Sequence, residues 1–175
     1  MNMQAIYVAL LDRPADPEGL LYYEQATQSG QNYDALAAIT SSVEYRLRVT
    51  GQNFDDLNHV GRDYAWLFYN SMFNREPTEA EMVYWNDRIQ SGESTRETIA
   101  LDIFGGAQGD DRASYEEKVR AADELTTLLD TPDEVAAYAG PAAIQFGQQL
   151  LGMYGLGATI ENIEVEPYWS SFFQD

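Results

Sequence analysis

The chain has 175 residues, 45% of them hydrophobic and 13% aromatic, and a formal net charge of -19. Enough apolar residues are present for a folded core, which excludes a wholly disordered protein, and the charge makes nucleic acids and anionic membranes poor partners. No apolar run approaches the ~20 residues that span a bilayer, no signal peptide is recognisable at the N-terminus, and the absence of cysteine excludes disulfides and thiolate metal sites.

The first helices expected along the chain belong to a tandem duplication. Residues 6–23 recur at residues 68–85 without a gap, and a constant offset over this length is unlikely to arise by chance. Matched pairs include Tyr7 and Tyr69, Arg13 and Arg75, Tyr22 and Tyr84, and Gly30 and Gly92. We expect helices over residues 3–12, 17–29, 33–40 and 42–50 in copy one (about residues 3–50), and over residues 55–74, 79–91 and 95–104 in copy two (about residues 55–106).

Helix ends are marked by capping residues. An N-cap side chain accepts from the exposed amides of the first turn, a glutamate three residues later completes a capping box, and glycine ends a helix in the left-handed conformation. The expected N-caps are Asp16, Thr78, Ser94, Ser114 and Thr131, and the expected stops are Gly30 and Gly92.

Apolar residues at steps of three and four predict the buried faces. The central helix, from about Asp55 to Asn74, carries such a stripe, and Tyr23 and Trp85 lie on the inward face of the second helix of each copy. The stripe of the central helix consists of Leu57, Val60, Tyr64, Phe68 and Met72.

Residues 107–175 lie outside the duplication and are expected to form a C-terminal helical extension packed on the module of residues 1–106. Helices are expected at 114–130, 132–139 and 141–154, whereas residues 160–168 suit either an extended segment or a tail. The sequence therefore predicts an all-α, compact multi-helix domain built from a duplicated helix-turn-helix motif.

The repeated residues resemble the bacterial domain of unknown function 4214, whose motif combines a Tyr, an Arg, a Pro-Asp turn, a Gly and a Tyr-Trp pair. Copy one has Tyr7, Arg13, Asp16, Gly19 and Tyr22, with Tyr23 in place of the Trp; copy two has Tyr69, Arg75, Pro77, Tyr84 and Trp85, with Thr78 and Glu81 in place of the Asp and Gly. The segment Ser42 to Tyr45 is similar to an ending shared with the distantly similar phycobilisome linker domains. The resemblance covers about residues 3–106.

This resemblance implies a helical module of large secreted bacterial proteins, among them surface-layer proteins and type I secreted proteins with calcium-binding repeats. It implies an extracellular, cell-surface location and no enzymatic activity. The implied partners are cell-surface polysaccharide or lipopolysaccharide, or neighbouring protein subunits.

Exposed aromatic side chains are the candidates for contact with a glycan or a partner, since aromatic rings stack on sugars. These candidates are Tyr22, Tyr84, Trp66 and Trp169. The other motif residues are expected to be structural, with Arg13 bonding helix-end carbonyls and pairing with carboxylates such as Asp16 or Glu18. The structural set is Arg13, Asp16, Gly19, Tyr23, Gly30, Arg75, Pro77, Trp85 and Gly92.

Metal ligands are not identified by the sequence. His59 is the single histidine and has no convergent partners, so a solvent-facing side chain is expected. Residues 105–110 resemble one calcium-binding nonapeptide with a misplaced glycine, and one copy cannot form a calcium roll. No cofactor is expected, and calcium binding remains compatible with the acidic surface.

The leading hypothesis is a non-enzymatic module of an extracellular bacterial surface or secreted protein that mediates attachment to glycan, or assembly. The alternatives are an intracellular linker-like scaffold that binds proteins, and an accessory domain of a secreted enzyme. Nothing in the residue pattern is a catalytic signature.

Overall fold

The computed structural model describes residues 2–27, 33–50 and 60–154, and within these ranges all regular elements are helices. Copy one contains α1 (Met3–Leu11), α2 (Pro17–Thr27), α3 (Tyr33–Thr40) and α4 (Val43–Thr50), and copy two contains α5 (Val60–Phe73), α6 (Glu79–Ser91) and α7 (Ile99–Gly106). The extension adds α8 (Gly109–Leu128), α9 (Pro132–Ala137) and α10 (Gly140–Gly152). The predicted all-α class is confirmed.

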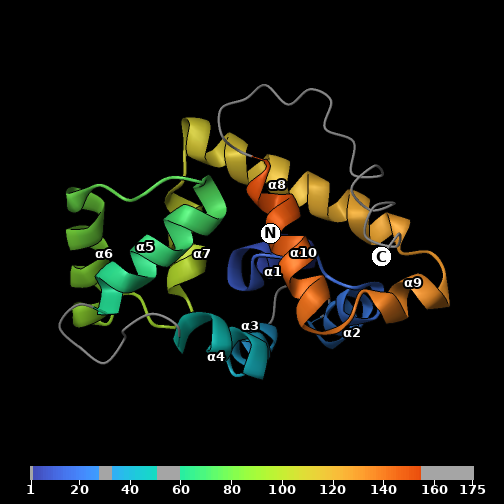
Figure 1. Ribbon diagram of the computed structural model, residues 1–175. Helices are drawn as coiled ribbons and strands as arrows, with labels where there is room; N and C mark the ends of the chain where they lie inside the picture. Colours follow the sequence, from blue (N-terminus) through green and yellow to red (C-terminus); the bar gives the residue numbers. More distant parts are fainter. Residues whose placement is uncertain (1, 28–32, 51–59, 155–175) are drawn as a thin grey trace.

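The long helix α8 joins the two copies. It runs across the top of the molecule in Figure 1, with copy two at one end and copy one at the other, and it packs against both α1 and α5. The Tyr115 hydroxyl donates to the Ala5 carbonyl in copy one, and Lys118 donates to the Ser71 carbonyl in copy two. Because α1 and α5 also contact each other, the two copies and the extension share one core.

Buried side chains follow the predicted stripes. On α5, Tyr64, Phe68 and Met72 are buried, and α1 is buried on every side, as expected for a helix enclosed by neighbours. On α8, Tyr115 and Leu125 are buried in the same cluster. The central position of α1 explains why the N-terminal helix has no polar face.

Most of the predicted helix ends are confirmed. Thr78 and Thr131 each form a capping box with the glutamate three residues on, the Asp16 carboxylate accepts from the Gly19 amide at 2.7 Å, and Gly92 ends α6 at φ 77°. The left-handed conformation at Gly92 is one that a residue without a Cβ adopts at little cost.

Two predicted N-caps are wrong. Helix α8 begins at Gly109 rather than at Ser114, because Gln108 is extended and two aspartates in the first turn stabilise the helix N-terminus, so Ser114 lies buried inside the helix. Helix α7 begins at Ile99 rather than at residue 95, because Thr95 and Thr98 form a turn of their own. The Ser94 hydroxyl instead accepts a bond from Arg88 at 3.1 Å.

Several predictions fall on residues that the structure does not describe. These are Gly30, the first turns of the predicted central helix with Leu57 and His59, the segment 160–168 and Trp169.

Candidate functional site

The turn that follows α5 organises the polar end of copy two. Asn74 ends α5 in the left-handed conformation at φ 52°, and Arg75 then points back toward the start of α6. Arg75 binds two carboxylates at once: Nη2 lies 2.8 Å from Glu81 Oε1 and 2.7 Å from Asp111 Oδ2. Its guanidinium also lies 4.7 Å from the centroid of the Tyr69 ring.

These contacts fix the charge of Glu81. Hydrogen bonds from Arg75, and further bonds from the Thr78 amide and hydroxyl, lower the pKa of Glu81 to about 2. Glu81 is therefore ionised at neutral pH and holds no proton to donate as a general acid.

A groove of about 660 Å³, here called the copy-two groove, opens beside this ion-pair cluster. It is lined by residues of α5, α6 and α7 and the first turn of α8, including Tyr84, Trp85, Arg88, Asp102 and Gly105. Tyr84 is 52% exposed, whereas Trp85 beneath it is 5% exposed and donates from Nε1 to the Tyr69 hydroxyl at 3.1 Å. A firmly held indole thus supports a ring that faces solvent.

Two side chains of opposite charge line the groove together with the exposed ring. Arg88 lies 5.7 Å from the centroid of the Tyr84 ring and pairs with Glu93 at 3.0 Å. Asp102, on α7, accepts from the Thr98 hydroxyl through Oδ2 at 3.0 Å, and its Oδ1 has no partner in the described part of the chain. An aromatic ring and a carboxylate oxygen in one groove suit a ligand that has both an apolar face and hydroxyl donors.

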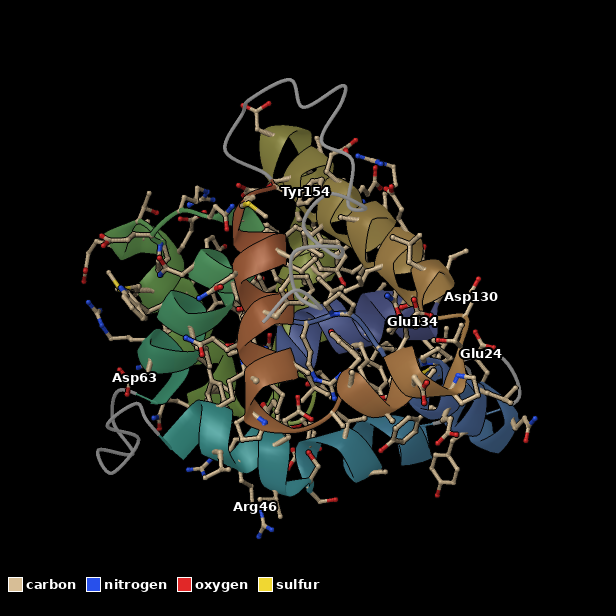
Figure 2. All side chains as sticks on the ribbon, turned by 45° about the vertical axis from the view of Figure 1, so that its right-hand side comes forward. Glu24, Arg46, Asp63, Asp130, Glu134 and Tyr154 are labelled. Atoms are coloured by element: carbon tan, nitrogen blue, oxygen red, sulfur yellow. The ribbon has the colours of Figure 1, made fainter. Side chains whose placement is uncertain are left out.

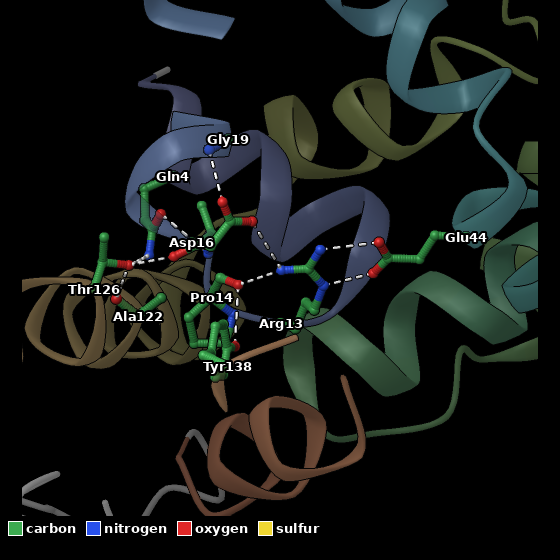
Figure 3. Close-up of polar contacts among 10 residues, drawn as sticks. Gln4, Arg13, Pro14, Asp16, Gly19, Glu44, Ala122, Thr126 and Tyr138 are labelled. Carbon is green, nitrogen blue, oxygen red and sulfur yellow. Dashed lines mark hydrogen bonds and ion pairs between the residues drawn. The ribbon is translucent and has the colours of Figure 1, made fainter. Parts of the chain in front are cut away.

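The matched turn of copy one is more deeply buried, with Arg13 12% exposed and Arg75 36% exposed. The Arg13 guanidinium forms a bidentate pair with Glu44 of α4, at 2.5 and 2.9 Å, and donates to the Pro14 carbonyl at 2.9 Å (Figure 3). Asp16 lies 4.0 Å away. The expected partner Glu18 has no ion pair with Arg13 among the described residues, because Glu44 reaches the guanidinium from another helix.

Helices α9 and α10 cover this turn. The Tyr138 hydroxyl donates to the Pro14 carbonyl at 3.2 Å, and Gly147 of α10 approaches so closely that a Cβ there would lie 3.0 Å from Arg13 Cβ. A second groove of about 780 Å³ remains beside the turn, the copy-one groove, which includes Arg13, Asp16, Glu44 and Asp130 in its lining. Figure 2 shows Asp130, which lines this groove, with Glu134 near it at the right of the molecule.

The structure brings Tyr84 and Trp85 into a groove but separates the other candidates from it. Tyr22 is 65% exposed, and its ring contacts that of Tyr23 edge-to-face with the centroids 5.1 Å apart. Trp66 on α5 is 42% exposed. Neither Tyr22 nor Trp66 lines either groove. Pro77 is buried in the turn, matching Ala15 of copy one.

Sequence reasoning missed Asp102, Arg88 and Asp111 as residues of this site. Arg88 could have been found from helical spacing, since it lies four residues after Tyr84 on the same face. Asp102 lies on another helix, α7, so spacing from Tyr84 does not reach it. Asp111 is 36 residues from Arg75, and no local pattern connects them.

Sequence reasoning also missed a buried polar cluster at the ends of α1 and α5. Lys118 is the single lysine of the chain and is 1% exposed; it donates to the Ser71 carbonyl and to Asn74 Oδ1. Burial lowers the pKa of Lys118 to about 8, although Asp12 opposes the shift, and Arg48 adds to it. Arg48 in turn lies 3.9 Å from Asp12.

Within the described ranges, no cluster of three or more histidine, aspartate and glutamate side chains is arranged to hold a metal ion. No described helix is both long and apolar enough to cross a bilayer.

Residues 51–107 match the family model of the Domain of unknown function (DUF4214). The family that the motif predicts is thereby confirmed over copy two, which contains the copy-two groove, and copy one lies outside the matched segment. No curated protein and no solved structure matches the chain.

Proposed function

We propose that this chain is a non-enzymatic module of an extracellular bacterial surface or secreted protein, and that it attaches that protein to cell-surface glycan through the copy-two groove. One observation carries the proposal: an exposed tyrosine ring, supported by a buried tryptophan, lies beside carboxylate acceptors in a groove of about 660 Å³. A ring of this kind supplies the flat apolar face on which a pyranose stacks.

The state of the groove carboxylates favours binding over catalysis. Glycoside hydrolysis needs one carboxyl group that keeps its proton near neutral pH and a second that is ionised. Arg75 instead holds the pKa of Glu81 at about 2, so Glu81 cannot be the proton donor of such a pair.

The proposal is tested by isothermal titration of the purified chain with bacterial surface polysaccharides, with and without calcium. Tyr84→Ala is expected to weaken binding at least ~10-fold, about the value of one aromatic stacking contact. Tyr22→Ala is the matched control, since it removes the equivalent exposed ring of copy one, and it should leave binding unchanged. Absence of binding by the unaltered chain in both conditions would refute glycan attachment.

A second candidate, a scaffold that binds proteins, is favoured by apolar side chains on the surface of copy one. Leu21 on α2 and Val43 and Leu47 on α4 are 55, 63 and 70% exposed. Sedimentation of the chain alone over a range of concentrations tests this candidate, with Leu47→Glu expected to abolish any association that this surface mediates.

A further inference from the structure

The charges around the copy-two groove restrict which glycan it can hold, an inference that rests on the proposed function. Glu81 and Asp111 share one cation, Arg75, so this cluster carries one net negative charge. Asp102 contributes a second negative charge, since its described partner is the neutral hydroxyl of Thr98.

Arg88 is the one cationic residue in the described lining of this groove. Its guanidinium already pairs with a carboxylate: Nη1 lies 3.0 Å from Glu93, and Nε donates to Ser94 at 3.1 Å. An anionic ligand would have to compete with Glu93 for this cation. It would do so on a chain whose formal net charge is -19, so long-range electrostatics oppose its approach as well.

A neutral sugar is not repelled by these charges and can bind the carboxylates as a donor. Hydroxyl groups are donors, and Asp102 Oδ1 is a charged acceptor that lacks a described protein partner. Bonds of a hydroxyl to a carboxylate are about twice as strong as those between neutral groups. The groove is open at Gly105 and Gly106, where a Cβ at either position would meet no atom within 4 Å.

We infer that the copy-two groove selects uncharged sugar rings, which stack on Tyr84 and donate hydroxyls to Asp102, and that it rejects glycans that carry carboxylate or phosphate groups. The ligand class is therefore the neutral part of a surface polysaccharide. Acidic lipopolysaccharide cores and polyuronates are excluded from this groove.

The test compares neutral and acidic polymers on the same chain. Dextran, galactomannan and chitin oligosaccharides serve as neutral probes, and polygalacturonate and alginate as acidic probes, each in 50 and 500 mM NaCl with chelator. We expect binding to at least one neutral probe that changes less than about twofold with salt, since an uncharged ligand is not screened, and at least ~10-fold weaker binding of the acidic probes.

Two variants connect the selectivity to the groove. Asp102→Asn should weaken binding of the neutral probe several-fold and narrow the gap to polygalacturonate. Asp87→Asn removes an exposed carboxylate of α6 that does not line the groove and should change neither quantity. Circular dichroism of each variant confirms that it is folded.

The outcomes separate the two proposals. Tighter binding of an acidic probe than of every neutral probe, with strong salt dependence, would overturn the neutral selectivity and leave glycan attachment standing. Equal loss in Asp102→Asn and Asp87→Asn would also overturn it. Failure of all probes to bind would refute the attachment function itself.

Discussion

In copy one the arginine turn lies beneath α10, with Tyr138 and Gly147 packed on it and the copy-one groove beside it. In copy two the matched turn lies beside the copy-two groove and the first turn of α8. The Arg13 side chain is accordingly 12% exposed and that of Arg75 is 36% exposed. Both arginines bind carboxylates and lie over a tyrosine ring. The same motif thus contacts the extension in both copies, but through α10 in copy one and through Asp111 of α8 in copy two.

The two turns also differ at one matched position, which is Gly19 in copy one and Glu81 in copy two. Gly19 leaves room for the Tyr7 hydroxyl, which would lie 2.6 Å from a Cβ there. In copy two the matched residue is Glu81, which binds Arg75, while the Tyr69 hydroxyl accepts from Trp85. Glu81 therefore supplies Arg75 with a carboxylate that has no counterpart at Gly19.

Replacing each of the two arginines should reveal the largest difference in stability between the two copies. Arg13→Gln leaves the Glu44 carboxylate, 25% exposed, without its cation beneath α10, and we expect a loss of about 3 kcal/mol in unfolding free energy. Arg75→Gln should cost about 1 kcal/mol, because water reaches Glu81 and Asp111. Urea denaturation of both variants measures the difference, and equal losses would show that the cover over copy one has no energetic effect.

The pH dependence of stability tests the Lys118 cluster that joins both copies. The folded pKa of about 8 lies below the unfolded value of 10.5, so the unfolded chain binds more protons between these values and stability rises with pH there. Relative to Lys118→Met, which does not titrate, the unaltered chain should gain about 2 kcal/mol between pH 7 and 9.5.

Tyrosines set the upper limit of this measurement. Burial raises the pKa of Tyr115 and Tyr138, so the folded chain retains their protons above pH 10 while the unfolded chain loses them. Stability then falls as the pH rises further.

The Lys118 prediction fails if the difference in unfolding free energy between the unaltered chain and Lys118→Met stays constant from pH 7 to 9.5. That result would mean that Lys118 is not buried in solution.

Overpacking at Gly147 should loosen the cover over copy one alone. In Gly147→Ala the new Cβ would lie 2.7 Å from the Tyr138 hydroxyl and 3.0 Å from Pro14 Cδ, and we expect a loss of about 1 to 2 kcal/mol. Gly152→Ala, also in α10, is the control, since its Cβ meets nothing within 4 Å. Glycan binding should not change in either variant, and a change in Gly147→Ala would show that the two grooves are coupled.

The smallest effects are expected at the matched N-caps. Asp16→Ala and Thr78→Ala each remove the acceptor for an amide of the first helical turn and should cost about 1 kcal/mol. The loss should be larger for Asp16, whose bond to the Gly19 amide is 2.7 Å and whose charge favours the helix N-terminus. Thermal unfolding of the two variants measures both losses. A larger loss in stability for Thr78→Ala than for Asp16→Ala would contradict this order.

Local patterns were enough to predict most of the helices, because the caps at Asp16, Thr78 and Thr131 depend only on residues within one turn. They failed at Ser114, where the spacing to a glutamate that suits a capping box occurs inside a longer helix. The Tyr84 ring could be predicted as exposed, but the Arg75 to Asp111 pair depends on how α8 packs. Lys118 lies three residues after Tyr115, so its place on the buried face was present in the helical period.

Asn74 joins copy two to the C-terminal extension through its side chain. Its Nδ2 donates to the carbonyls of Gly152 and Tyr154, at 3.1 and 2.5 Å, and its Oδ1 accepts from Lys118. Figure 2 shows Tyr154 near α8, at the end of α10. All three partners lie beyond residue 107, so the segment that matches the family is shorter than the unit that folds in this chain. A chimera that transplants copy two must therefore carry α8 and the end of α10, or supply substitutes for both.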